Sequence, residues 1–135
     1  MAFLGTINCD TDGKGLYELS SQVQNLLPAD AEGLCHLFIR HTSASLVITE
    51  NADPTVHSDL ENFMSHLAPD GDPRYQHTAE GPDDMSAHIR SVLTKSELNI
   101  PVKAGHLLLG VWQGIYLWEH RSHAKRRSVV CTLLA

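Results

Sequence analysis

The sequence predicts an α+β fold in a single domain spanning residues 1–135. The chain is close to the usual size of one domain, and no repeat, low-complexity tract or linker divides it. Segments with the two-residue period of strands stand on either side of two main segments with helical spacing. Helices that lie between groups of strands are typical of α+β proteins rather than of alternating βαβ order.

The first 50 residues are expected to hold four strands and a short helix. The turn-rich residues 10–13 separate the first two strands. The helix begins at Ser20 or Ser21, either of which can cap it, and Pro28 stops it. The predicted strands are residues 3–9, 15–19, 34–41 and 45–50, and the predicted helix is residues 20–27.

Two main helices with a long loop between them are expected next. Asp53 caps the first helix, and a proline follows it in the first turn. The second helix begins near Asp83 or Asp84 and ends near Lys95. Residues 68–82 form a polar loop of about 15 residues, a length that is more often functional or mobile than idle. The apolar positions expected to face the core are Val56, Leu60, Phe63 and Leu67 in the first helix and Met85, Ile89, Val92 and Leu93 in the second.

Antiparallel strands are expected to complete the chain. A reversal at residues 113–114 and another over residues 121–127 separate them. The one basic cluster, Lys-Arg-Arg at 125–127, fits a solvated turn, with an anion contact as the alternative. The predicted strands are residues 97–102, 106–112, 115–121 and 127–134.

The composition excludes several classes of protein. A net charge of −6 argues against a nucleic-acid partner, which calls for a basic face. No apolar run approaches the roughly 20 residues of a membrane helix, and the N-terminus lacks the features of a signal peptide. Three widely spaced cysteines do not suggest a disulfide framework. We therefore expect a cytoplasmic protein with no membrane partner.

Histidine is unusually frequent, with nine residues. His77 and His88 suggest a metal site. Asp84 and His88 stand four residues apart and are neighbours on one side of the second helix, where the carboxylate can orient the imidazole. A capping Asp beside a surface His is the alternative. His77 lies in the long loop, eleven residues before His88, which fits neither the helical two-histidine metalloprotease motif nor zinc-finger spacing. A third metal ligand would have to come from elsewhere, and His41 is the best candidate.

Three further polar side chains border apolar faces. His41 and Glu119 each extend the apolar face of a strand. For His41 the alternative is a core histidine bonded to the backbone, while a carboxylate at Glu119 needs a cation or hydrogen-bond partner. Asp59 stands on the flank of the first helix, one turn after Val56, where a solvated role is the alternative. We expect Asp59 and Glu119 to lie at least partly buried near the histidines.

Several segments together resemble the YjbQ family, whose members are often described as secondary thiamine-phosphate synthases. The matching segments are HTSASLVITENADP at 41–54, Asp59, YQHTAEGPDDMSAH at 75–88 and IPVKAGHLLLGVWQGIYLWEH at 100–120, followed by the closing basic strand. They occur in the family's order, and the resemblance covers essentially the whole chain. Thr49 departs from the pattern, because Asn is expected there.

The resemblance implies two mostly antiparallel β-sheets flanked by helices, a homotrimer and a site near a subunit interface. Trp112, Tyr116 and Trp118 are the expected interface anchors, because large aromatics favour interfaces. Nine polar residues match the family's site by position. Among them we expect His41, His77 and His88 to be metal ligands, Asp59, Asp84 and Glu119 to be catalytic, and Thr42, Ser43 and Asn51 to bind substrate.

The sequence is compatible with three functions. The first is a weak thiamine-phosphate synthase type of transfer, in which a pyrophosphate leaves and a metal stabilises its charge. The second is another metal-dependent enzyme, such as a hydrolase with Asp59 or Glu119 as general base. The third is a non-catalytic trimer that sequesters a metal or metabolite. Three imidazoles favour a zinc-like divalent metal, with magnesium as the alternative, and the substrate is a small, possibly phosphorylated molecule.

Overall fold

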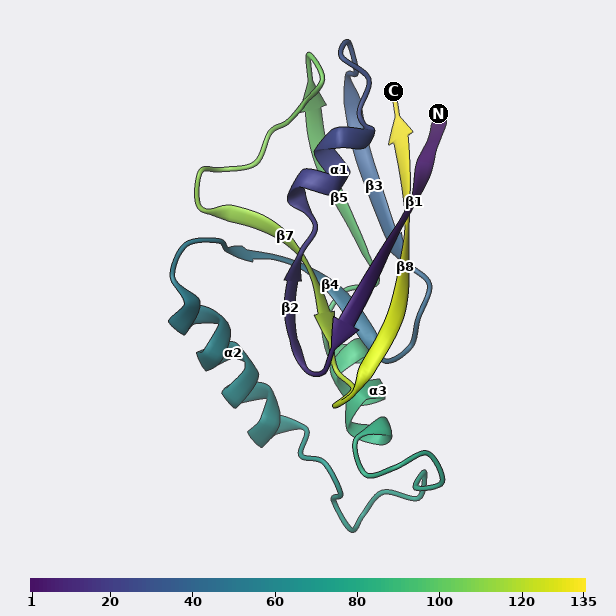
Figure 1. Ribbon diagram of the computed structural model, residues 1–135, viewed down its shortest axis with the longest axis vertical. Coiled ribbons are helices and arrows are strands. Elements are labelled where there is room, and N and C mark those ends of the chain that lie inside the picture. Colours follow the sequence, from purple (N-terminus) through teal and green to yellow (C-terminus); the bar gives the residue numbers. More distant parts are fainter.

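The computed structural model describes residues 1–135, which form two antiparallel sheets and three helices (Figure 1). The larger sheet has the order β1-β8-β3-β5-β6, and the smaller has the order β2-β7-β4. This arrangement confirms the α+β fold. The strands are β1 (Ala2–Asp12), β2 (Gly15–Glu18), β3 (Gly33–Ile39), β4 (Ala44–Glu50), β5 (Glu97–Lys103), β6 (His106–Leu107), β7 (Gln113–Glu119) and β8 (Ala124–Leu134). The helices are α1 (Ser20–Leu26), α2 (Pro54–Leu67) and α3 (Asp84–Leu93).

The hydrophobic core draws on both sheets and on α1. Strands β5 and β8 alternate buried and exposed positions, as expected for strands with one face on a core. The larger sheet contributes Leu37, the smaller sheet contributes Leu117, and α1 contributes Val23, all fully buried. The two strand groups that flank the main helices in the sequence therefore meet in space. None of the helices is both long and apolar enough to cross a membrane.

The two main helices occupy the predicted segments but turn a different face inward. Asp53 caps α2, as predicted, by accepting a hydrogen bond from the Thr55 amide at 2.9 Å. However, Phe63 of α2 is 59% exposed and Val92 of α3 is 84% exposed, so the predicted core-facing stripes are wrong. Helical periodicity identifies the apolar side of a helix but not what covers it. The buried positions are Met64 in α2 and Asp84, Ser86, Ala87 and Arg90 in α3.

Three predicted boundaries differ from the structure because polar side chains serve other partners. The Oγ of Ser20 accepts from the Ile115 amide at 2.9 Å instead of capping α1. The predicted reversal at residues 113–114 is wrong, because Gln113 begins β7. The turn falls earlier, where the Gln113 amide donates to the Gly110 carbonyl and the Gln113 side chain accepts from the Gly110 amide. The strand predicted at 106–112 is therefore reduced to His106–Leu107.

The loop between α2 and α3 projects beyond the lower end of the sheets in Figure 1. It closes on itself through a hydrogen bond from the Gly71 amide to the Pro82 carbonyl at 2.9 Å. The Tyr75 hydroxyl also donates to the Pro69 carbonyl at 2.9 Å. These contacts return the chain to the start of α3 and position His77 beside that helix.

Candidate functional site

Three of the predicted side chains converge at the beginning of α3. The Nε2 atoms of His77 and His88 lie 2.6 and 3.0 Å from the same carboxylate oxygen, Oδ2 of Asp84. The centroids of the two imidazole rings are 5.5 Å apart. Asp84 and His88 meet because they stand one helical turn apart, whereas His77 is brought in by the folded loop. The structure therefore joins a loop histidine and a helix histidine in one cluster, as the sequence indicated.

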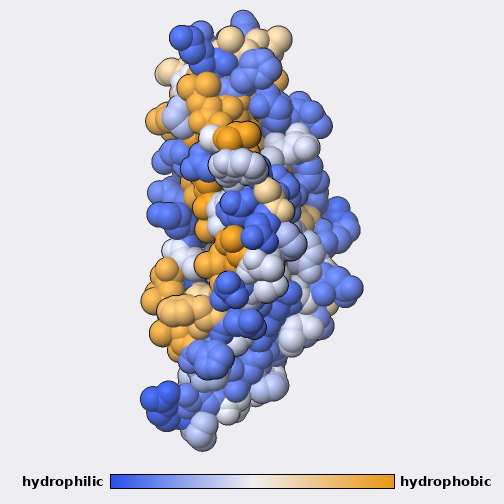
Figure 2. Space-filling view, turned by 90° about the vertical axis from the view of Figure 1, so that its left-hand side faces the viewer, coloured by the Kyte–Doolittle hydropathy of each residue, from blue (hydrophilic) through white to orange (hydrophobic).

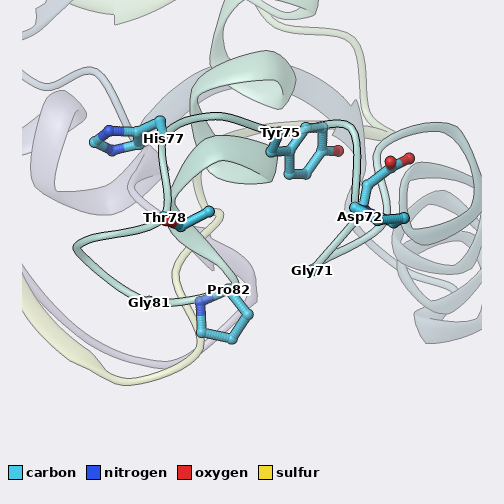
Figure 3. A pocket seen from close by; sticks show the side chains of 8 residues that line it. Gly71, Asp72, Tyr75, His77, Thr78, Gly81 and Pro82 are labelled. Carbon is cyan, nitrogen blue, oxygen red and sulfur yellow. The ribbon is translucent and has the colours of Figure 1, made fainter.

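Figure 3 shows the loop that carries His77 wrapped around a cavity of about 340 Å³. The His77 ring points away from Tyr75, on the opposite side of the loop from that aromatic ring (Figure 3). His77 thus stands at the edge of the cavity, where its Nε2 faces α3. The residues that line the cavity are Gly71, Asp72, Pro73, Tyr75, His77, Thr78, Gly81 and Pro82.

Arg121, which was not among the predicted site residues, fixes the carboxylates of the cluster. Its Nη1 donates to Oδ1 of Asp84 at 2.7 Å, and its Nε donates to Oδ2 of Asp83 at 2.9 Å. Its Nη2 donates to the backbone carbonyl of Glu80 at 3.0 Å. With Oδ1 held by Arg121, Asp84 presents Oδ2 to the histidines. Sequence alone gave no signal for Arg121, which falls in the segment predicted as a reversal.

Contacts within the cluster favour the ionised forms of Asp84 and His77. Burial raises the pKa of Asp84, but the hydrogen bond with His77 and the positive charge of Arg121 outweigh it, so the pKa is lowered. The hydrogen bond to Asp84 in turn raises the pKa of His77. The cluster therefore contains a carboxylate that is held ionised and attracts a positive charge, either a proton on an imidazole or a metal ion.

His88 has the hydrogen bonding of a metal ligand. Its Nδ1 lies 3.0 Å from the backbone carbonyl of Thr42, which can only accept, so Nδ1 carries a proton. In a neutral imidazole this leaves a lone pair on Nε2, the atom that faces the Asp84 carboxylate. Metal-bound histidines are commonly oriented in this way, through a bond from the other ring nitrogen.

The donor set fits a metal ion. The three ligand atoms of His77, Asp84 and His88 all lie within 4.8 Å of one another. Bonds of about 2.0–2.1 Å place two ligands of one zinc ion at most roughly 4.2 Å apart, so small side-chain rotations would complete the site. Three protein ligands are also the number that catalytic, rather than structural, zinc sites commonly use.

Glu119 is buried as expected, but it belongs to a different cluster. Its side chain is 0% exposed and accepts from Arg127, from the Thr11 hydroxyl at 2.6 Å and from the backbone amides of His120 and Arg121 at 3.1 Å. Burial raises the pKa of Glu119, but the bonds from Arg127 and Thr11 hold it below its usual value. The Glu119 carboxylate has no free position for a metal or a substrate proton, so its prediction as a catalytic residue is wrong. Its partner, Arg127, comes from the basic cluster predicted as a solvated turn.

His41 makes no hydrogen bond with the cluster. Its Nε2 accepts from the Ser128 amide at 2.9 Å, so this lone pair cannot bind a metal. Burial, helped by the nearby charge of Arg127, lowers the pKa of His41. The structure thus shows the backbone-bonded alternative for His41, and it groups His77, Asp84 and His88 as possible metal ligands without His41. His41 still shares a polar cavity of about 360 Å³ with Thr42 and His88.

The remaining predicted residues have diverse positions. Asp59 is exposed on α2 and bonds to none of the histidines, so its predicted burial beside them is wrong. Asn51 donates to the Val111 and Gln113 carbonyls at 3.1 and 3.3 Å and so supports the turn that leads into β7. Ser43 is buried and accepts from Arg127 at 2.9 Å. Only Thr42 touches the cluster, through its backbone carbonyl.

Comparison with known proteins identifies relatives along the whole chain. The model of the family described as UPF0047 protein YjbQ-like matches residues 5–135. UPF0047 protein sll1880 of Synechocystis sp. is 50% identical over 122 residues, which cover 89% of this chain and 83% of that protein. UPF0047 protein YjbQ of Escherichia coli O157:H7 is 40% identical over 136 residues, which cover 98% of both chains.

Solved structures agree with this relationship. The conserved hypothetical protein TT1486 of Thermus thermophilus superimposes with a TM-score of 0.88 at 34% identity, covering 96% of this chain and 99% of that chain. A yjbq/upf0047 family protein of Clostridium acetobutylicum has a TM-score of 0.83 at 28% identity, with 95% and 99% coverage. The match along the sequence and the shared fold have one explanation: the chain belongs to the UPF0047 family of YjbQ-like proteins.

Proposed function

We propose that His77, Asp84 and His88 bind a divalent metal ion and that this protein is a metal-dependent enzyme acting on a small molecule. The observation that carries the proposal is the geometry of His88. Its Nδ1 proton is committed to the Thr42 carbonyl, while its Nε2 faces the ionised Asp84 carboxylate at 3.0 Å. That contact is favourable only if Nε2 carries a second proton or a cation lies between the two groups. A metal ion satisfies His77, Asp84 and His88 together.

The donor set favours a zinc-like metal over magnesium. Magnesium prefers oxygen ligands and retains several waters, whereas two imidazoles with one carboxylate suit zinc and similar transition metals. Arg121 supports the choice indirectly, because it holds Oδ1 of Asp84 and leaves a single carboxylate oxygen for the metal. In this role, Asp84 and the two histidines hold the ion, which would polarise a substrate group placed at an open position.

The reaction is proposed from the family resemblance together with the charges around the site. A thiamine-phosphate synthase type of transfer needs cationic or N–H donors for the leaving pyrophosphate. Arg121 is the cation in contact with the cluster, and its guanidinium is occupied by Asp83, Asp84 and the Glu80 carbonyl. We therefore expect this transfer to be weak. Metal-assisted hydrolysis is the second candidate, because it needs no additional cation.

We also propose a homotrimer, as the family resemblance implies. Figure 2 shows apolar side chains gathered in patches on an otherwise hydrophilic face. One apolar area lies on α3, where Met85, Ile89, Val92 and Leu93 line a shallow cavity of about 190 Å³ beside His88. Exposed apolar patches commonly mark interaction sites. Of the expected anchors, Trp112 is 63% exposed and suits an interface, while Tyr116 and Trp118 are buried within the chain and do not. Light scattering at micromolar concentration tests the assembly, and a monomer mass would reject it.

Metal analysis of the purified protein tests the proposed site. We expect about one zinc-like ion per chain in the wild type and little in His77→Ala or His88→Ala. His36→Ala is the matched control, since His36 also pairs with a carboxylate, at 2.7 Å from Glu97, but lies on the larger sheet. Pyrophosphate release and ester or amide hydrolysis, measured on the same proteins, separate the two reactions. Retained metal with no turnover would point instead to a binding protein.

A further inference from the structure

Glu80, in the turn that precedes α3, approaches the cluster from the side of His77. Its Oε2 lies 3.2 Å from Nε2 of His77, the same nitrogen that lies 2.6 Å from Oδ2 of Asp84. Two carboxylates thus converge on one ring nitrogen, which can offer a single proton. Two carboxylates this close are favourable when a positive charge lies between them, either a proton on His77 or a metal ion. A metal ion bound at Nε2 of His77 would provide it and would be within reach of both carboxylates.

The backbone of Glu80 is fixed by two hydrogen bonds, whereas its side chain is largely exposed and contacts the cluster only at its carboxylate. Arg121 donates to the Glu80 carbonyl at 3.0 Å, and the Gly81 amide closes the turn on the Thr78 carbonyl. Gly81 has a φ of +103°, a conformation that favours glycine, so this turn is specified locally. The side chain of Glu80 is nevertheless 65% exposed, while that of Asp84 is 4% exposed. One carboxylate of the cluster is therefore anchored and the other can move.

We propose that Glu80 is a fourth, exchangeable ligand of the metal. This inference rests on the proposed metal site at His77, Asp84 and His88. Those three residues supply the permanent donors, and Glu80 occupies a further position when no substrate is present. Because the Glu80 side chain is 65% exposed, it can rotate into solvent and leave this position to a donor atom of the substrate. The site would then be closed at rest and open during turnover.

The test compares Glu80→Gln with Glu97→Gln. Glu97 is a matched control, because its side chain is 60% exposed and its Oε2 lies 2.7 Å from a histidine, His36, on the larger sheet. Zinc affinity is measured by competition with a chelator, and the ligand environment is read from the visible absorption of bound Co²⁺. We expect Glu80→Gln to weaken zinc binding roughly tenfold or more and to shift the Co²⁺ bands. Glu97→Gln should stay within about twofold of the wild type.

Each alternative result has a definite meaning. If Glu80→Gln binds zinc like the wild type while His77→Ala does not, the metal site stands and the role of Glu80 is rejected. A weaker affinity with an unchanged Co²⁺ spectrum would show a remote effect of charge and would also reject Glu80 as a ligand. If the wild type itself binds neither zinc nor Co²⁺, both the metal site and the inference fail. Glu80 is exposed and its anchored group is a backbone carbonyl, so the variant should fold.

Discussion

Two carboxylates of this protein, Asp84 and Glu119, are each held by an arginine, yet their surroundings differ. Asp84 accepts from Arg121 through Oδ1 and turns Oδ2 toward two histidines at the edge of the molecule. Glu119 lies in the interior, and both of its oxygens are occupied by Arg127, Thr11 and backbone amides. One carboxylate therefore has bonding capacity left for a ligand, and the other has none.

The comparison shows that residue type and burial do not by themselves identify a functional carboxylate. Asp84 and Glu119 are 3% and 0% exposed, and each has a pKa below its usual value after favourable contacts outweigh burial. The difference lies in their partners. Arg127 and two backbone amides bind Glu119 permanently, whereas the histidines beside Asp84 can exchange a proton for a metal ion. Glu119 is thus expected to serve the fold, and Asp84 is expected to serve the site.

The largest expected effect is on stability, in Glu119→Gln. The substitution leaves Arg127 buried without its charge partner, and breaking a buried ion pair in this way costs about 3–5 kcal/mol. Urea unfolding should show this loss, while the protein that remains folded should bind zinc with unchanged affinity. Near-normal stability together with lost zinc binding would reverse the roles assigned to Glu119 and Asp84.

The reciprocal change, Asp84→Asn, should act mainly on metal binding. It removes the charge of the buried, permanent carboxylate ligand and keeps the shape of the side chain, so we expect zinc affinity to fall by roughly 100-fold or more, about 2.7 kcal/mol. Arg121 retains its bond to Asp83, so the loss of stability should be smaller than in Glu119→Gln. Calorimetric titration and urea unfolding measure the two effects. Unchanged zinc affinity would show that Asp84 only supports the fold.

The pH dependence of stability extends the comparison to histidines. His120 follows Glu119 in the chain and has a lowered pKa, whereas His77 beside Asp84 has a raised pKa. Burial, together with the charge of Arg90, lowers the pKa of His120 from 6.5 to about 3 in the folded protein. Below pH 6.5 the unfolded chain binds a proton at His120 that the folded chain does not, so this histidine lowers stability as the pH falls. A His120→Gln variant has no imidazole at this position and so lacks this pH dependence. Its deficit in unfolding free energy relative to wild type should shrink by about 2 kcal/mol between pH 7 and pH 5. An equal deficit at both pH values would mean that His120 does not titrate as proposed.

The smallest effect is expected for Asp59→Asn. Asp59 is exposed on α2 and contacts neither carboxylate cluster, so unfolding free energy should change by no more than about 0.5 kcal/mol. Zinc affinity of the isolated chain should also stay within about twofold of the wild type. A large loss of activity in the assembled protein, with both quantities unchanged, would indicate that Asp59 acts across a subunit contact.

Local sequence patterns were sufficient for the fold class and for part of the site. Strand alternation and helical spacing predicted the α+β class, and Asp53 predicted the beginning of α2. The spacing of Asp84 and His88 placed them side by side, because residues one helical turn apart are neighbours in any α-helix. Each of these features depends on residues close together in the chain, so no knowledge of the packing was needed.

The tertiary structure alone decided which polar groups became partners. Arg121 reaches Asp84 across 37 positions of the chain, and Arg127 reaches Ser43 across 84. Such pairs leave no periodic signal in the sequence, because they form only when strands and loops from different sheets pack together. The same packing left Phe63 of α2 and Val92 of α3 exposed. It also directed the Ser128 amide to the Nε2 lone pair of His41. The sequence therefore determined which residues are neighbours along an element, while long-range packing determined which of them remain free to bind a ligand.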